Sequence, residues 1–181
     1  MTSSSAGSGS AGRPLVFLDV DGPLNPFEAN PTQRPEGYLT YRMRPEAWST
    51  APKPLRVWLN PEHGPRLLAL PGELVWATTW MTEANQLIGP EIGLPELPVV
   101  IWPETRRRSG AAGLHWKTRA LVEWAAGRPF VWIDDELTAA DREWVGTHHD
   151  GRALLHHVDA RRGLTDADFT LLEKWLLTYD H

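Results

Sequence analysis

The fold is decided by the stretch Leu15-Val16-Phe17-Leu18-Asp19-Val20-Asp21-Gly22. Four apolar residues in a row predict a strand that is buried on both faces, as the strands of a parallel sheet are. The acidic residues and the glycine that follow are typical of a loop at the carboxyl end of such a strand. We take this run as the first core strand, with Asp19 and Asp21 at its end.

Strands and helices alternate along the rest of the chain. Further apolar strands are predicted over residues 73–78, 97–102, 129–133 and 153–158. Helices are predicted over residues 60–70, 82–88, 114–126, 138–147 and 165–177, with turn and capping residues at their ends. This alternation predicts an α/β fold, a three-layer α/β/α sandwich around a mostly parallel, five-stranded, Rossmann-like sheet.

The segment after the first strand interrupts this pattern. Residues 38–43 and 55–59 look extended and lie in a stretch rich in proline, so we expect a hairpin that serves as a small flap or cap insertion at about residues 26–59. Residues 1–12 consist almost entirely of Ser, Gly, Ala and Thr, a composition that favours a flexible tail. Residues 13–181 are then expected to form a single domain.

Composition excludes several classes of protein. The chain of 181 residues has 18 basic and 23 acidic residues. Its net charge of −5 argues against a protein whose whole surface binds nucleic acid or an anionic membrane. It has no cysteine, which excludes disulfides, thiolate nucleophiles and cysteine-ligated metals. No apolar run approaches the roughly 20 residues that span a bilayer, and the N-terminus lacks a secretory pattern. We therefore expect a cytoplasmic protein without a membrane partner; the oligomeric state is unknown.

Polar residues follow three of the predicted strands at the point where each strand ends. They are Asp19 and Asp21, Thr78 and Thr79, and Asp134 and Asp135. Because the carboxyl ends of parallel strands share one edge of a sheet, these side chains are expected to line one acidic crevice. Carboxylates that are crowded together repel one another unless a cation lies among them, and oxygen ligands favour Mg²⁺. The sequence therefore predicts a Mg²⁺ site at this edge.

The segment from Phe17 to Asn25 resembles the first signature of the haloacid dehalogenase-like (HAD) hydrolases. That signature reads Asp-x-Asp-Gly-x-hydrophobic-Asn and follows an apolar strand. Further signatures of the family occur in the same order along this chain, at Thr78, Lys117 and Asp134-Asp135. The resemblance covers about residues 15–158, and the ordered set is more specific than any one of its motifs.

The resemblance implies a role for each matching residue. Asp19 would be the nucleophile that forms an aspartyl-phosphate, and Asp21 would act as general acid and then as general base. Thr78 would donate a hydrogen bond to a phosphoryl oxygen, and Lys117 would balance the negative charge. Mg²⁺ would be held by the Asp19 carboxylate, the backbone carbonyl of Asp21 and the Asp135 carboxylate.

Three of these assignments have competitors in the sequence. Thr79 competes with Thr78, since the register of the strand is not fixed by sequence. Asp134 competes with Asp135 as the metal ligand. The competitors of Lys117 are Arg119 and the run Arg106-Arg107-Arg108.

Contacts to the substrate are expected from Asn25, Thr79, Arg106 and Arg108. The arginines could bind a distant anionic group or a nucleic-acid backbone, although such a run is more often solvated surface. Trp80 and Trp102 could stack on a base, although packing in the core is the commoner role.

The resemblance predicts a Mg²⁺-dependent phosphatase that hydrolyses a phosphomonoester, with a phosphorylated small molecule as substrate. The first alternative is a phosphatase acting on nucleotides or nucleic-acid ends, which the arginine run and the lack of a large cap suggest. The second is a non-catalytic metal-binding domain of HAD-like fold. The presence of Asp21 argues against the second alternative, because a domain without turnover has no need of an acid/base residue in a costly acidic cluster.

Overall fold

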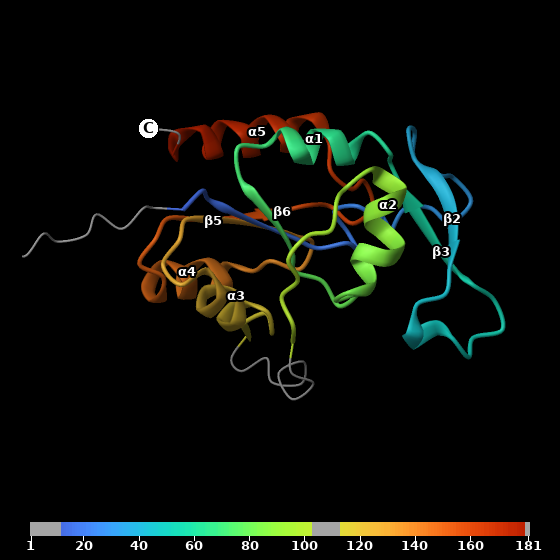
Figure 1. The fold of residues 1–181 in the computed structure, drawn as a ribbon, viewed down its shortest axis with the longest axis horizontal. Helices are drawn as coiled ribbons and strands as arrows, with labels where there is room; N and C mark the ends of the chain where they lie inside the picture. The colour runs from blue at the N-terminus through green and yellow to red at the C-terminus, as the bar shows by residue number, and fades with distance from the viewer. Residues whose placement is uncertain (1–11, 103–112, 180–181) are drawn as a thin grey trace, which may run out of the picture.

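The computed structural model describes residues 12–102 and 113–179, and its centre is a parallel sheet with strand order β4-β1-β5-β6 (Figure 1). The four strands are β1 (Leu15–Leu18), β4 (Glu73–Trp76), β5 (Phe130–Asp134) and β6 (Ala153–His157). The chain passes from β1 to β4 on one side and then to β5 on the other, so β1 lies where the strand order switches. Ligands of open α/β sheets bind at this point, beyond the carboxyl ends of the strands.

Helices cover both faces of the sheet and make the predicted three-layer sandwich (Figure 1). One face carries α1 (His63–Ala69) and α5 (Asp166–Leu176), and the other carries α3 (Thr118–Ala125) and α4 (Ala139–His148). The predicted three-layer α/β architecture is therefore confirmed.

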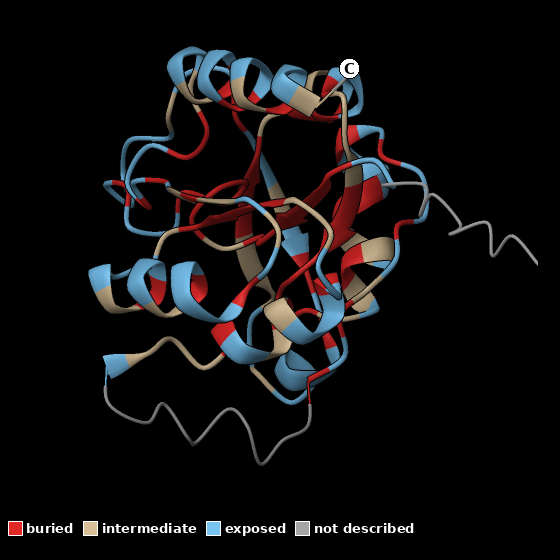
Figure 2. Ribbon diagram, turned by 90° about the vertical axis from the view of Figure 1, so that its left-hand side faces the viewer, coloured by how far each residue is buried: buried red, intermediate tan, exposed pale blue. Residues whose placement is uncertain are grey.

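Alternation along β1 divides the core into two layers. Val16 and Leu18 pack with Leu172 of α5, whereas Leu15 and Phe17 pack with Leu121 of α3. The side chains of successive residues in a strand point to opposite faces, so a fully apolar strand supplies both layers. Figure 2 shows that buried residues concentrate in the sheet and on the helix faces that turn toward it.

The predicted hairpin is present after β1. It pairs β2 (Leu39–Met43) with β3 (Leu55–Leu59) in antiparallel register, and the short 3₁₀ helix η1 (Glu46–Trp48) lies in the connection between them. Val57 and Leu59 are fully buried in the same core layer as α5, so β3 is anchored to the body of the protein. A flap movement of this hairpin stays a prediction, as does the division into a tail and one domain.

The predicted fifth strand is wrong. Residues 97–102 make only an isolated bridge to β4, between Trp76 and Val99. Asn85 binds both backbone groups of Leu97: its Oδ1 accepts the N–H at 2.9 Å, and its Nδ2 donates to the C=O at 2.8 Å. Pro98 has no backbone N–H and so cannot donate a hydrogen bond to a neighbouring strand. The hydrogen bonds to Asn85 thus replace those of a strand, and the sheet has four strands in the described part of the chain.

Three helices differ in extent from the prediction. The helix expected over residues 60–70 is α1, which begins only at His63. The helix expected over residues 82–88 is a π-helical turn, η2 (Ala84–Ile88), which continues through Gly89 and Pro90 as α2 (Gly89–Ile92). Pro90 lies in the first turn of α2, where its missing N–H costs nothing. The helix expected over residues 114–126 is α3, which begins only at Thr118.

At the C-terminal end, α5 is followed by the 3₁₀ turn η5 (Leu177–Tyr179), which extends the predicted final helix slightly. The described segments contain no helix with the length and apolar character that crossing a membrane requires. The predicted tail at residues 1–12 lies outside the described residues except for Gly12.

Candidate active site

A buried lysine joins two of the predicted strand-end carboxylates. Asp19 directly follows β1, Asp134 ends β5, and Lys117 immediately precedes α3. The Nζ of Lys117 donates to Oδ2 of Asp19 at 2.8 Å and to Oδ2 of Asp134 at 2.7 Å, and the lysine is only 2% exposed. Arg119, its competitor in the sequence, is exposed and lies near the ring of Trp144 instead. The structure thus brings Lys117 into the cluster and leaves Arg119 outside it.

The two acids at the end of β5 have different surroundings. Asp134 is fully buried, and its Oδ2 accepts a second hydrogen bond, from Nε1 of Trp132 at 3.1 Å. Its Oδ1 accepts the backbone N–H of Glu136 at 3.1 Å. Asp135 is only half-buried and lines a cavity. Of the pair, Asp135 is therefore the carboxylate that faces an incoming ligand.

Gly22 makes room for Asp135. A Cβ atom placed on Gly22 would lie 2.5 Å from Cγ of Asp135, and the residue has a φ of +96°. Only glycine combines this backbone conformation with so close an approach. The glycine of the Asp-x-Asp-Gly motif is thus explained by the position of a carboxylate from another strand.

The cluster holds more acidic than basic groups. Asp19, Asp134 and Asp135 each offer an oxygen, and these oxygens lie within 4.8 Å of one another, with Lys117 as the ammonium bonded to two of them. Burial, and then the neighbouring Asp134, raise the pKa of Asp135 to about 7. Burial also raises the pKa of Asp19 to about 8, although the Lys117 ammonium opposes this shift.

The lysine and Asp134 form the ionised pair of the cluster. Burial alone would favour their neutral forms, but the charges of Asp19 and Asp134 outweigh it and raise the pKa of Lys117. In turn the Lys117 ammonium holds the pKa of Asp134 below its usual range, against the effect of burial. A divalent cation would supply the positive charge that Asp19 and Asp135 lack, so the donor set fits Mg²⁺.

These residues open onto a cavity of about 170 Å³. It is lined by Asp19, Asp21, Phe27, Thr79, Trp116, Lys117, Asp135 and Glu136. Thr79 is exposed there, whereas Thr78 is fully buried and its hydroxyl accepts the N–H of Trp80 at 3.2 Å. The structure therefore places Thr79 on the cavity wall and Thr78 behind it.

Asp21 is held in place through both of its oxygens. Oδ1 accepts a hydrogen bond from Nδ2 of Asn25, and Oδ2 accepts one from Nε1 of Trp80, each at 2.9 Å. Oδ1 of Asn25 in turn accepts the backbone N–H of Trp58 in β3 at 3.1 Å. Asn25, predicted to contact substrate, is 5% exposed and does not line the cavity; it connects Asp21 to the hairpin.

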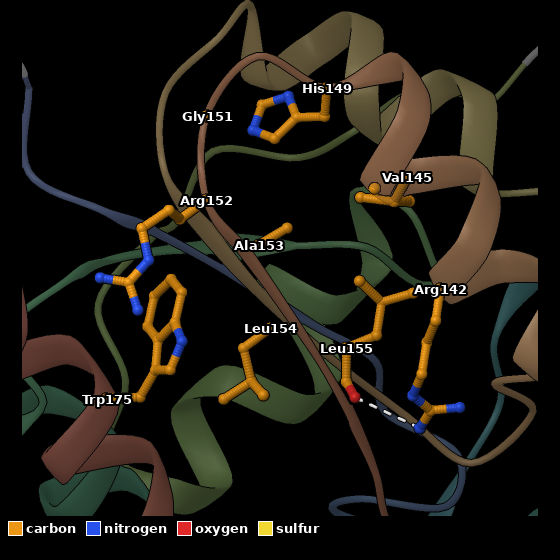
Figure 3. A pocket seen from close by; sticks show the side chains of 10 residues that line it. Arg142, Val145, His149, Gly151, Arg152, Ala153, Leu154, Leu155 and Trp175 are labelled. Atoms are coloured by element: carbon orange, nitrogen blue, oxygen red, sulfur yellow. Dashed lines mark hydrogen bonds between the residues drawn. The ribbon is translucent and has the colours of Figure 1, made fainter.

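A larger cavity, of about 430 Å³, lies beside the edge strand β6 between α4 and α5 (Figure 3). Its lining includes Arg142, His149, Arg152 and Trp175 but no carboxylate. In Figure 3 the Arg142 guanidinium reaches the backbone O of Leu155, to which Nη2 donates at 3.3 Å. This cavity contains none of the predicted site residues, so it is not the candidate metal site.

Sequence analysis missed the roles of several aromatic residues. Trp80 and Trp102 are buried, at 7% and 3% exposure, and do not line this cavity, in agreement with the commoner core role and not with stacking on a base. The aromatic residues on its wall are Phe27 and Trp116, whose position no sequence motif marks. Arg106 and Arg108, also predicted to bind substrate, lie outside the described residues.

Comparison with known proteins yields one family. The family model described as the HAD domain in Swiss Army Knife RNA repair proteins matches residues 15–169. A comparison with curated proteins and one with solved structures found no match. The matched region begins at β1 and extends into α5, so it contains every element that supplies the cluster.

Substituting Gly22 tests the close approach of Asp135. Gly22→Ala should lose more stability than the ~1–2 kcal/mol that a left-handed backbone conformation costs an alanine, because its Cβ also collides with Asp135. Gly93→Ala is the matched control, since Gly93 has a φ of +77° and open space around it. Mg²⁺ should raise the melting temperature of Gly93→Ala but not that of Gly22→Ala. Equal losses of stability, with the Mg²⁺ response kept in both variants, would contradict this interpretation.

The raised pKa values predict how stability depends on pH. In the folded state Asp19 has a pKa of about 8 and Asp135 a pKa of about 7, whereas both carboxyl groups release their protons near pH 4 in the unfolded chain. Stability should therefore fall as pH rises from about 6.5 to about 8.5 in the absence of divalent metal. His63, whose pKa burial lowers to about 4, titrates below this window.

The measurement is the melting temperature across that range, with and without Mg²⁺. Mg²⁺ should flatten the fall because it replaces the protons. Without metal, Asp135→Asn should make the fall smaller but not abolish it, because Asp19 still releases its proton near pH 8. A metal-free melting temperature that stays constant or rises over this range would show that the two acids are ionised like ordinary carboxyls.

Proposed function

Because the chain belongs to the family of HAD domains in Swiss Army Knife RNA repair proteins, we propose that it is a Mg²⁺-dependent phosphatase, which hydrolyses a phosphomonoester through an aspartyl-phosphate on Asp19. One observation carries the proposal. The Asp19 carboxylate lies on a cavity wall with Asp21 and Asp135 beside it, while its Oδ2 is bonded to the buried ammonium of Lys117. A carboxylate in such surroundings can act as a nucleophile toward phosphorus.

The proposed reaction has two steps. In the first, an oxygen of Asp19 forms a bond to phosphorus, the bond from phosphorus to the leaving oxygen breaks, and Asp21 gives that oxygen its proton. In the second, water attacks the phosphorus, Asp21 takes a proton from the water, and the bond from phosphorus to Asp19 breaks. Phosphate is released and both carboxyls return to their starting states.

The environment of Asp21 suits this task. The N–H groups of Asn25 and Trp80 fix its two oxygens on the side of the cavity shared with Asp19. A fixed acid/base needs no reorganisation when the proton moves, which lowers the barrier. Trp80 and Asn25 are accordingly positioning residues in this proposal.

The metal would be held by the carboxylates of Asp19 and Asp135 and by the backbone carbonyl of Asp21. When bound, Mg²⁺ polarises the phosphoryl group and offsets negative charge as the bonds change. Asp134 is left out of this set because it is fully buried and does not line the cavity, while its oxygens accept hydrogen bonds from Lys117, Trp132 and Glu136.

Lys117 and the threonines would stabilise the remaining negative charge on the phosphoryl group. Lys117 is bonded to the Asp19 oxygen and so lies next to the position where negative charge grows. Thr79, on the cavity wall, offers its hydroxyl to a phosphoryl oxygen. The corresponding role for Thr78 stays a prediction.

The substrate that we favour is the phosphorylated end of a nucleic acid, because the matched family is described from RNA repair proteins. A phosphorylated small molecule is the other candidate. No residue of β2 or β3 is among the described residues that line the cavity, so in this proposal the hairpin does not enclose it and leaves room for a strand end.

Separate substitutions of the two aspartates test the mechanism. Asp19→Asn should lower kcat by ~10³-fold or more, because the nucleophile is lost. Asp21→Asn should slow hydrolysis of an ordinary phosphomonoester by ~10²–10⁴-fold. With an aryl phosphate, whose leaving group needs no proton, Asp21→Asn should release one equivalent of the phenol in a burst and phosphate only slowly. The assay is phosphate and phenol release with Mg²⁺ and with EDTA.

Asp150→Asn is the control, since Asp150 is an exposed acid in the turn between α4 and β6 and lies outside the cavity lining. It should behave as the unaltered protein does. Full activity in Asp19→Asn would refute the nucleophile, and full activity in EDTA would refute the metal. Metal-dependent stabilisation without turnover of any phosphomonoester would favour the non-catalytic alternative.

A further inference from the structure

Two aromatic residues line the cavity that contains the proposed nucleophile. Phe27, shortly after β1, and Trp116, directly before Lys117, line the same cavity as Asp19 and Asp135. Phe27 is 47% exposed and Trp116 is half-buried. One exposed aromatic ring is ordinary on a protein surface, but two aromatic residues in the lining of the charged cavity point to a ligand that is apolar in part.

The backbone around Phe27 is fixed. Its N–H donates to the carbonyl of Asn25 at 2.8 Å, and the next N–H, that of Glu28, donates to the carbonyl of Ala160 at 3.1 Å. Asn25 itself is bonded to Asp21. The exposed ring is thus carried by the same anchored turn that positions the proposed acid/base.

Trp116 is fixed by its neighbours, and the Nζ of Lys117 lies over its ring at 5.6 Å from the centroid. The ring of His115 stacks on it at a centroid distance of 5.5 Å, and Trp102 packs edge-on at 5.0 Å. The backbone N–H of Lys117 donates to Nδ1 of His115 at 3.1 Å. The indole is therefore a rigid surface next to the lysine that holds Asp19.

The chemistry of the cavity separates into two parts. The carboxylates and Lys117 can bind a metal and a phosphoryl group. The rings of Phe27 and Trp116 can bind a flat apolar group that is attached to the phosphoryl group. Nucleobases have such a face, and stacking on aromatic side chains tolerates any base. Sugar and glycerol phosphates have none.

We infer that Phe27 and Trp116 form a stacking subsite for the terminal nucleoside of a phosphorylated nucleic-acid strand and select it over phosphomonoesters without a base. The inference rests on the proposed phosphatase function and adds the two residues that recognise the substrate. A cavity of about 170 Å³ holds the phosphoryl group and its immediate surroundings, and the rest of a strand extends into solvent.

The first experiment compares kcat/KM for short oligoribonucleotides that carry a 3′- or a 5′-terminal phosphate. Each is paired with the same strand whose terminal nucleotide is abasic. The unaltered protein should prefer the base-bearing end by about tenfold or more, the fold-change expected from stacking one base. Phe27→Ala should reduce that ratio by about fivefold or more, and Trp116→Ala should reduce it likewise.

Three controls keep the test decisive. Leu171→Ala removes an exposed apolar side chain of α5, 45% exposed and outside the cavity lining, and should keep the preference unchanged. If Trp116→Ala fails to fold, Phe27→Ala alone tests the stacking subsite, because the exposed side chain of Phe27 contributes little to the core. The 5′-mononucleotide and a phosphotyrosine peptide complete the set of substrates, and equal or better turnover of either would overturn the choice of a strand end.

Binding separates the failure of this inference from the failure of the proposed function. Fluorescence anisotropy of the same oligonucleotides is measured with Asp19→Asn, alone and combined with Phe27→Ala. Turnover without a base preference would overturn the subsite and leave the phosphatase intact. A base preference in binding that Phe27→Ala removes, without turnover by the unaltered protein, would support the subsite and overturn the phosphatase.

Discussion

The charge balance around Lys117 is the constraint on which the site depends. Its ammonium is buried and bonded to Asp19 and Asp134, two acids from different strands. A lysine in this position would be costly without its partners, and the acids would be costly without it. Asp135 adds a further carboxylate to the group. The excess of acidic over basic groups that results favours a divalent cation, which can replace the protons of Asp19 and Asp135.

The parallel sheet brings these groups together. β1 is flanked by β4 and β5, so the residues after these strands emerge at one edge. Asp19, Thr79 and Asp135 reach the cavity from three different strand ends. Gly22 then allows the loop after β1 to approach Asp135 more closely than any other residue would permit. Backbone geometry and electrostatics thus both favour a cation site at this edge of the sheet.

Features carried by local pattern could be predicted from the sequence. The apolar run of β1 and the acids after it predicted the central strand and the edge of the sheet where the acidic cluster lies, and the order of motifs predicted Lys117 in preference to Arg119. The fifth strand was wrong because Asn85, a residue distant in sequence, binds the backbone of Leu97. A pattern of apolar residues contains no information on such a side-chain partner.

Contacts between distant segments were equally hidden. Trp80 holds Asp21 from 59 positions away, and Trp58 binds Asn25 from 33 positions away. Composition alone could not separate Trp116, on the cavity wall, from Trp102, which supports it from the core. What the sequence specified was the chemistry of the site; the residues that orient this chemistry required the fold.

The most direct test of the central claim is to trap the covalent intermediate. Protein mixed with a substrate labelled in its phosphoryl group, and quenched in acid within the first turnover, is digested and analysed by mass spectrometry. We predict a phosphoryl group on the peptide that contains Asp19, attached to that residue and absent from the Asp19→Asn protein. Turnover with no label on the protein at any time within the first cycle would contradict the account, because water would then attack the substrate directly.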